Sequence, residues 1–210
     1  MAVIRGVTHP RPDYGVYNQG VSDVPEGADW SPADHPYAIA VSEAMWWRCA
    51  VQLAVARLDG SNDPRSAPVS SQQVDARNLV FALVQLLAAE RLEQRALRDL
   101  GVESEIREEL AAARARFLAA LPGLQEMRNA LTHFDEWAVG HGWGPQRRSV
   151  AEGSDRRDVA GAFWGFGYDP GEQAVRLGPF KISASSALRA ATKLERAIGA
   201  AAIEVDGRAQ

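Results

Sequence analysis

The amino-acid sequence predicts a mainly α-helical protein: a bundle of four to five helices, with a β-hairpin inserted before the last helix and an irregular N-terminal arm. Three observations lead to this prediction. Apolar residues recur at helical spacing in several long segments, a strand–turn–strand pattern precedes the last of them, and proline and glycine interrupt the start of the chain. We therefore expect an arm at residues 1–36 and a single helical domain at residues 37–210.

The composition is that of a globular protein with one sizeable core. Of the 210 residues, 46% are hydrophobic and 24% are charged. The net charge of −4 and the pI near 5.6 argue against a protein that coats nucleic acid generally, so any contact with nucleic acid requires a local patch. We find neither the apolar segment of a signal peptide nor an apolar run of transmembrane length, and therefore expect a cytoplasmic protein with no membrane contact.

Long helices are predicted wherever the apolar spacing is helical. The second helix opens on a capping-box pattern, Ser70 followed by Gln73, and Gly101 is its natural stop. In the third, Pro122-Gly123 is expected to kink or split the helix. Ser183, Ser185 and Ser186 are the cap candidates of the last helix. The four segments are residues 36–58, 70–100, 104–137 and 183–205.

Residues between the third and last helices differ in character. Residues 140–158 are rich in glycine and carry arginines that could steer an RNA backbone, although nearby acidic residues equally fit an ordinary solvated loop. Residues 159–182 predict a β-hairpin that turns at Asp169-Pro170-Gly171. The arginines are Arg147, Arg148, Arg156 and Arg157.

Metal and cofactor chemistry find little support in the sequence. The single cysteine, Cys49, excludes an internal disulfide and a multi-cysteine zinc site, and its apolar setting predicts a buried side chain. The H-E-x-x-H, P-loop, G-x-G-x-x-G and G-x-S-x-G patterns are missing. We therefore expect no metal and no cofactor.

The stretch MRNALTHFDEW, residues 127–137, separates into two faces when it is drawn as a helix of about 100° per residue. An apolar stripe would face the core, and Asn129 and His133 would lie nearly opposite it, with Arg128 at the edge between the two faces. The stripe consists of Leu124, Met127, Leu131 and Phe134.

The polar face carries two kinds of group that phosphodiester cleavage uses, a proton-transfer group and a phosphate-binding group. Histidine exchanges protons near neutral pH, and arginine forks onto a phosphate and stabilises its developing charge. Asn129 can orient the imidazole of His133 or hold a substrate oxygen. A second proton-transfer group is missing, and a two-fold dimer through the face of Arg128 and His133 would supply it.

The sequence R-N-A-L-T-H at 128–133 resembles the R-x4-6-H signature of HEPN domains, small helical bundles found among ribonuclease toxins and phage-defence proteins. The resemblance implies a metal-independent endoribonuclease with a composite site in a homodimer, where the RNA 2′-OH attacks the adjacent phosphate. Carried over by position, the resemblance implies that Arg128, Asn129 and His133 are the catalytic residues. The same resemblance makes a nucleotidyltransferase-type antitoxin a conceivable partner.

Two alternatives remain open beside this hypothesis. The first is a non-catalytic HEPN-like module for dimerisation or for binding a ligand or RNA, in which Arg128 and His133 form ordinary surface contacts. The second is a small-molecule enzyme whose pocket lies between the bundle and the hairpin. His141 and the aromatic residues Phe163, Trp164 and Phe166 would line that pocket.

Overall fold

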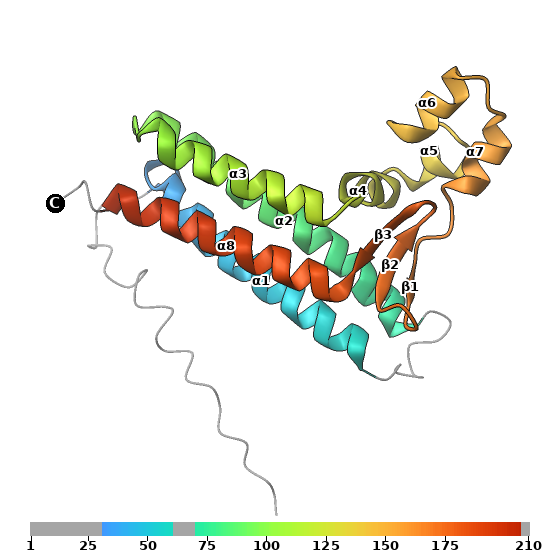
Figure 1. Cartoon of the computed structure of the whole chain (residues 1–210), viewed down its shortest axis with the longest axis horizontal. Coiled ribbons are helices and arrows are strands. Elements are labelled where there is room, and N and C mark those ends of the chain that lie inside the picture. The colour runs from blue at the N-terminus through green and yellow to red at the C-terminus, as the bar shows by residue number, and fades with distance from the viewer. Residues whose placement is uncertain (1–30, 61–69, 207–210) are drawn as a thin grey trace, which may run out of the picture. The chain divides into compact units, whose positions relative to one another are not determined.

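Helices dominate the computed structural model, which describes residues 31–60 and 70–206 (Figure 1). The chain divides into two units, residues 1–34 and 35–210, and each is treated by itself. Of the first unit only the short 3-10 helix η2, Pro32–Asp34, and the residue before it are described. The arm predicted at residues 1–36 therefore falls almost wholly outside the described residues.

The second unit is a helical bundle with a small sheet. Its long helices are α1 Pro36–Asp59, α2 Ser71–Asp99, α3 Ser104–Ala120 and α8 Ala184–Asp206. Its short helices are α4 Leu124–Thr132, α5 Phe134–Ala138, α6 Pro145–Ala151 and α7 Arg156–Ala162. Its strands are β1 Gly167–Asp169, β2 Ala174–Leu177 and β3 Phe180–Ser183. The predicted fold class, mainly α with a hairpin before the last helix, is confirmed.

The core lies where the four long helices meet. α1 packs along α2, and α8 contacts α1, α2 and α3, so these helices run side by side (Figure 1). Leu83 and Leu86 of α2 and Ile198 of α8 are completely buried. Burial of each such side chain contributes roughly 1.5–3 kcal/mol to stability. None of the described helices combines the length and the apolar character that crossing a membrane requires.

The hairpin is a three-stranded antiparallel meander. β1 pairs with β2 and β2 with β3, with Val175 opposite both Tyr168 and Ile182. All three of these side chains are buried against the bundle. The predicted turn at Asp169 is present, but the second arm turns again at Gly178-Pro179, and residues 159–162 belong to α7 instead of the first strand.

Several predicted helix ends are confirmed. Gly101 follows α2 with φ +68, and the N–H of Val102 donates to the carbonyl of Leu97, as in a Schellman motif. Ser183 caps α8, since its Oγ accepts from the N–H of Ser186 at 3.1 Å. The prediction of a capping box at Ser70 is wrong. The side chain of Gln73 instead accepts from the N–H of Tyr168 in β1 and donates to its carbonyl, which joins α2 to the sheet.

Cys49 is exposed, so the prediction of a buried side chain is wrong. The sequence around it is apolar because α1 also places Trp46 and Leu53 at the solvent side. With apolar residues on every side of the helix, the neighbours of Cys49 in sequence do not reveal which face it occupies.

Pro122-Gly123 splits the third predicted helix into α3 and α4, as the sequence indicated. Gly123 precedes α4 with φ +83, a left-handed conformation that strains any residue with a Cβ. A Cβ built on Gly123 would also overlap Cβ, Cγ and Cδ1 of Phe180 in β3. The turn therefore requires glycine twice, once for its backbone angle and once for its contact with the sheet.

Gly123→Ala should destabilise the protein more than Gly153→Ala. Gly153 also has a positive φ, +97, but a Cβ there meets no atom within 4 Å. Both substitutions pay a strain of about 1–3 kcal/mol, and only Gly123→Ala adds the collision with Phe180. Urea unfolding of both variants measures the difference. Equal losses would show that the contact with Phe180 does not constrain the turn.

Candidate functional site

The segment that carries the Arg-Asn-His pattern is broken at the histidine. α4 ends at Thr132 and α5 begins at Phe134, while His133 takes φ −121 and ψ 46, outside the helical region. The continuous helix that the sequence predicted here is therefore wrong at this position. His133 is both the C-cap of α4 and the N-cap of α5. Its N–H donates to the carbonyl of Asn129 at 2.8 Å.

The break accompanies the burial of Trp137. On a continuous helix, Phe134 would lie near Met127 on the core side, and Trp137 would lie about 80° away from it. In the structure Trp137 is 1% exposed and Phe134 is 63% exposed, so Phe134 is not part of the core stripe. The larger apolar surface of the indole favours this exchange, while its Nε1 is buried without a hydrogen-bond partner among the described residues, which opposes it.

The three predicted catalytic residues differ in their exposure. Arg128 and Asn129 are half-buried on α4, and His133 is exposed at the junction with α5. Nε of Arg128 is shielded from solvent and has no hydrogen-bond partner among the described residues. Within those residues no hydrogen bond joins the side chains of Arg128, Asn129 and His133, so they are neighbours along the chain without a direct link.

Two of the four predicted RNA-binding arginines come together. Arg147 on α6 and Arg156 on α7 line a hollow of about 390 Å³ with Trp143, and the guanidinium of Arg147 stacks over the Trp143 ring at 4.8 Å. Arg148 and Arg157 are exposed but do not line it. The glycine-rich region is thus two short helices, and the side chain of Asp155 caps α7.

His141 lies at that same hollow and not at the aromatic pocket, which corrects one detail of the small-molecule alternative. The backbone beside it is fixed by Gln146, which is completely buried. Oε1 of Gln146 accepts from the N–H of Gly142 at 2.8 Å, and its Nε2 donates to the carbonyl of Trp137 at 3.1 Å. These bonds connect α5 to α6.

A cavity of about 260 Å³ does lie between the bundle and the sheet, as the same alternative expected. Phe163, Trp164 and Phe166 contribute to its wall. From α2, Arg77 places its guanidinium 5.1 Å from the centre of the Phe166 ring. The cavity is therefore largely aromatic, with one cation at its edge.

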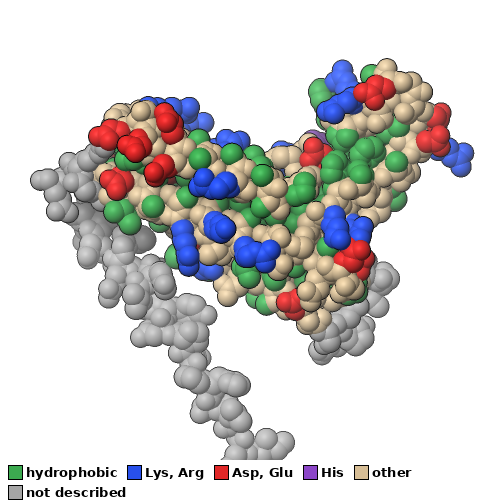
Figure 2. Space-filling view, in the orientation of Figure 1, with side chains coloured by type: hydrophobic (Ala, Val, Ile, Leu, Met, Phe, Trp, Pro, Cys, Tyr) green, Lys and Arg blue, Asp and Glu red, His purple; other side chains and the backbone are tan. Residues whose placement is uncertain are grey.

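Sequence reasoning missed a basic groove between α3 and α8. Arg116 of α3 and three cations of α8 line a cavity of about 410 Å³, and no ion pair among the described residues neutralises them. Figure 2 shows Lys and Arg side chains gathered over these helices. The signal in the sequence is the helical spacing of the three α8 cations, Arg189, Lys193 and Arg196.

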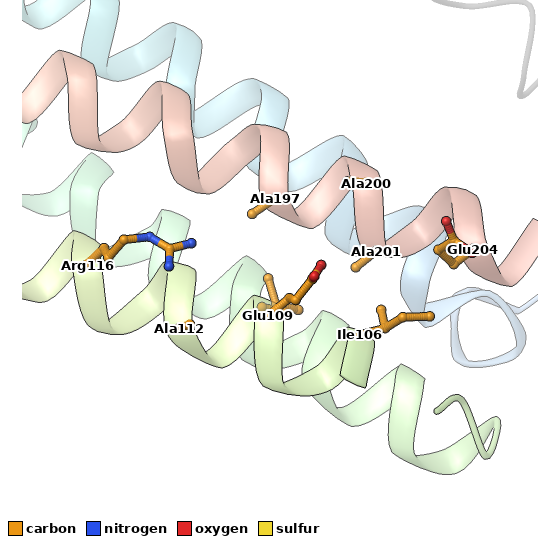
Figure 3. A pocket seen from close by; sticks show the side chains of 9 residues that line it. Ile106, Glu109, Ala112, Arg116, Ala197, Ala200, Ala201 and Glu204 are labelled. Atoms are coloured by element: carbon orange, nitrogen blue, oxygen red, sulfur yellow. The ribbon is translucent and has the colours of Figure 1, made fainter. Parts of the chain in front are cut away.

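The groove between α3 and α8 changes character along its length. A second stretch of about 480 Å³ is lined by four alanines, two larger aliphatic side chains, Arg116, Glu109 on α3 and Glu204 on α8 (Figure 3). Arg116 lines both stretches. The small alanine side chains leave space between the two helices. We assign no chemistry to this stretch of the groove.

Two carboxylates of α2, Glu90 and Glu93, are completely buried. Glu90 lies 3.6 Å from Nε of Arg114 on α3. Burial raises the pKa of Glu90, because loss of hydration outweighs the attraction of Arg114. Among the described residues no group of three His, Cys, Asp or Glu side chains could hold a metal ion.

No family model, no curated protein and no solved structure matches this chain. The resemblance to HEPN domains therefore stays a prediction from residues 128–133.

Glu90→Gln should change how stability depends on pH. Because the folded pKa of Glu90 lies above the ordinary value of 4.5, the wild-type protein loses stability as the pH rises from about 4.5 through that folded pKa. Glutamine does not titrate, so the free energy of unfolding of Glu90→Gln should rise relative to wild type over that range. Urea unfolding at several pH values measures this difference.

Glu108→Gln is the matched control, since Glu108 is an exposed carboxylate on the facing helix α3. It replaces a carboxylate that stays exposed, and so shows the effect of the substitution without burial. A constant difference between Glu90→Gln and wild type across the range would contradict a raised pKa at Glu90.

Proposed function

We propose that this protein is a HEPN-like, metal-independent endoribonuclease that acts as a homodimer, in the setting of phage defence or of a toxin–antitoxin pair. The observation that carries the proposal is the break at His133. It leaves the imidazole exposed, directly after a helix that holds Arg128 with its Nε out of solvent. A half-buried arginine is restrained before substrate binds, which favours precise contact with a phosphate.

The chemistry divides between two kinds of group. The RNA 2′-oxygen forms a bond to phosphorus while the bond from phosphorus to the 5′-oxygen of the next nucleotide breaks, which leaves a cyclic phosphate. One group removes the proton of the 2′-OH, and another gives a proton to the departing 5′-oxygen. His133 is suited to either task, and Arg128 stabilises the negative charge that grows on the phosphate oxygens.

The homodimer follows from this need for two proton-transfer groups. Each chain offers one histidine in the Arg128–His133 segment, so a second copy facing the first through this segment supplies the other. The basic groove between α3 and α8 supports an RNA substrate, because its cations are unpaired within the described residues of a chain with a net charge of −4.

A second candidate is the non-catalytic HEPN-like module that binds RNA or another ligand. One observation favours it: Arg128, Asn129 and His133 line none of the four cavities described above. In that case the aromatic cavity and the basic groove carry the function, and His133 has no role in it.

His133→Ala should lower the rate of RNA cleavage in the presence of EDTA by about 10²–10⁴-fold, because it removes a proton-transfer group. Arg128→Lys keeps the charge but loses the planar fork, and should also reduce the rate. Purified protein and mixed RNA, separated on a denaturing gel over time, provide the measurement.

His35→Ala is the matched control for this assay. It removes another exposed histidine, just before α1 and outside the cavities described above, so the cleavage rate should stay close to that of wild type. Equal cleavage by wild type and His133→Ala, or no cleavage of any RNA by the wild-type protein, would favour the binding module instead.

A further inference from the structure

The aromatic cavity begins at the residue after His133. Phe134, the first residue of α5, lines it together with Ala130 and Leu131, which follow Asn129 on α4. The remaining wall comes from elements far away in sequence, among them Arg77 of α2 and the connection at Trp164 and Phe166. One side of the segment at 128–137 thus carries the candidate catalytic groups, and the same segment forms one wall of a cavity.

The chemistry of the wall selects a flat aromatic ligand with polar edges. Phe134 and Trp164 are 63% and 56% exposed, so parts of their rings remain free for stacking. Aromatic rings stack on any nucleobase, because every base has a π-face. The Arg77 guanidinium beside Phe166 adds a planar cation that can stack on a base or donate to its acceptor atoms.

The size of the cavity also limits the ligand. At about 260 Å³ it lies just below the range of roughly 300–1,000 Å³ that holds drug-sized ligands. A single base fits this space better than a stack of several bases. A long apolar chain would make no polar contact with the guanidinium of Arg77.

We propose that this cavity binds one nucleobase of the RNA strand, beside the phosphate that Arg128 and His133 act on. This inference rests on the proposed function and adds a recognition element to the same site. The cavity and His133 are adjacent because Phe134 is the next residue along the chain. Because Phe134 lines the cavity and starts α5, a base stacked on it lies at the α5 side of the break.

The test uses binding of an RNA that cannot be cut, so that it is separate from catalysis. The probe is a short 2′-O-methyl oligoadenylate, in which the methyl group blocks the attacking oxygen. An abasic oligomer with the same number of phosphates is the control ligand, because it keeps the charge and lacks the bases. Isothermal titration measures both affinities with the full-length protein.

Trp164→Ala should weaken binding of the oligoadenylate about 10-fold or more, the loss expected from one stacked base, without changing binding of the abasic oligomer. Trp46→Ala is the matched control, because Trp46 is a similarly exposed tryptophan, at 66%, on α1 and outside the cavity. It should bind like wild type. His133→Ala should also retain binding, even if it abolishes cleavage.

Three results would overturn the inference: equal affinity for the two oligomers, an unchanged affinity in Trp164→Ala, or loss of dimers in that variant by analytical ultracentrifugation. The last result would assign the cavity to a contact between two copies of the chain. Base-dependent binding that is lost in Trp164→Ala, in a protein that cuts no RNA, would support the cavity while refuting the nuclease.

Discussion

The turn at Gly123 is the constraint on which the candidate site depends. Its positive φ turns the chain between α3 and α4. Because glycine has no side chain, Phe180 of β3 can pack directly against this turn. α4 then packs with Leu124 and Met127 buried, which fixes the helix that carries Arg128 and Asn129. A local backbone requirement in one residue thereby determines where the functional groups lie relative to the bundle.

The chain turns again at His133, between α4 and α5. Trp137 takes the core position that simple helical periodicity gives to Phe134. The exchange exposes the imidazole and directs Phe134 into the wall of the aromatic cavity. Gln146 then accepts from the N–H of Gly142 and donates to the carbonyl of Trp137, and these two buried bonds hold the backbone that follows α5.

The sequence was most informative where local chemistry determines the structure. Gly101, Ser183 and Pro122-Gly123 act on their own backbone, and each marked the correct boundary. Prediction failed where a distant partner decides the outcome: Gln73 bonds Tyr168 across the fold, and Trp137 displaces Phe134 through core packing.

The candidate site divides in the same way. The residue types at 128–133 indicate which reaction the site could catalyse. The break at His133 and the aromatic cavity beside it are seen only in the tertiary structure. The basic groove needs two helices that are far apart in sequence. Even so, three of its cations share one helical spacing on α8 and were visible in the sequence without their partner Arg116.

The most direct test of the account is the end group that the protein leaves on a cut RNA. Attack by the 2′-OH predicts a 2′,3′-cyclic phosphate on the upstream fragment, and no cutting where a 2′-deoxynucleotide replaces the nucleotide before the cut. Mass spectrometry of the fragments distinguishes these products. A fragment that ends in a 3′-hydroxyl, or cleavage after the 2′-deoxynucleotide, would contradict the roles assigned to Arg128 and His133.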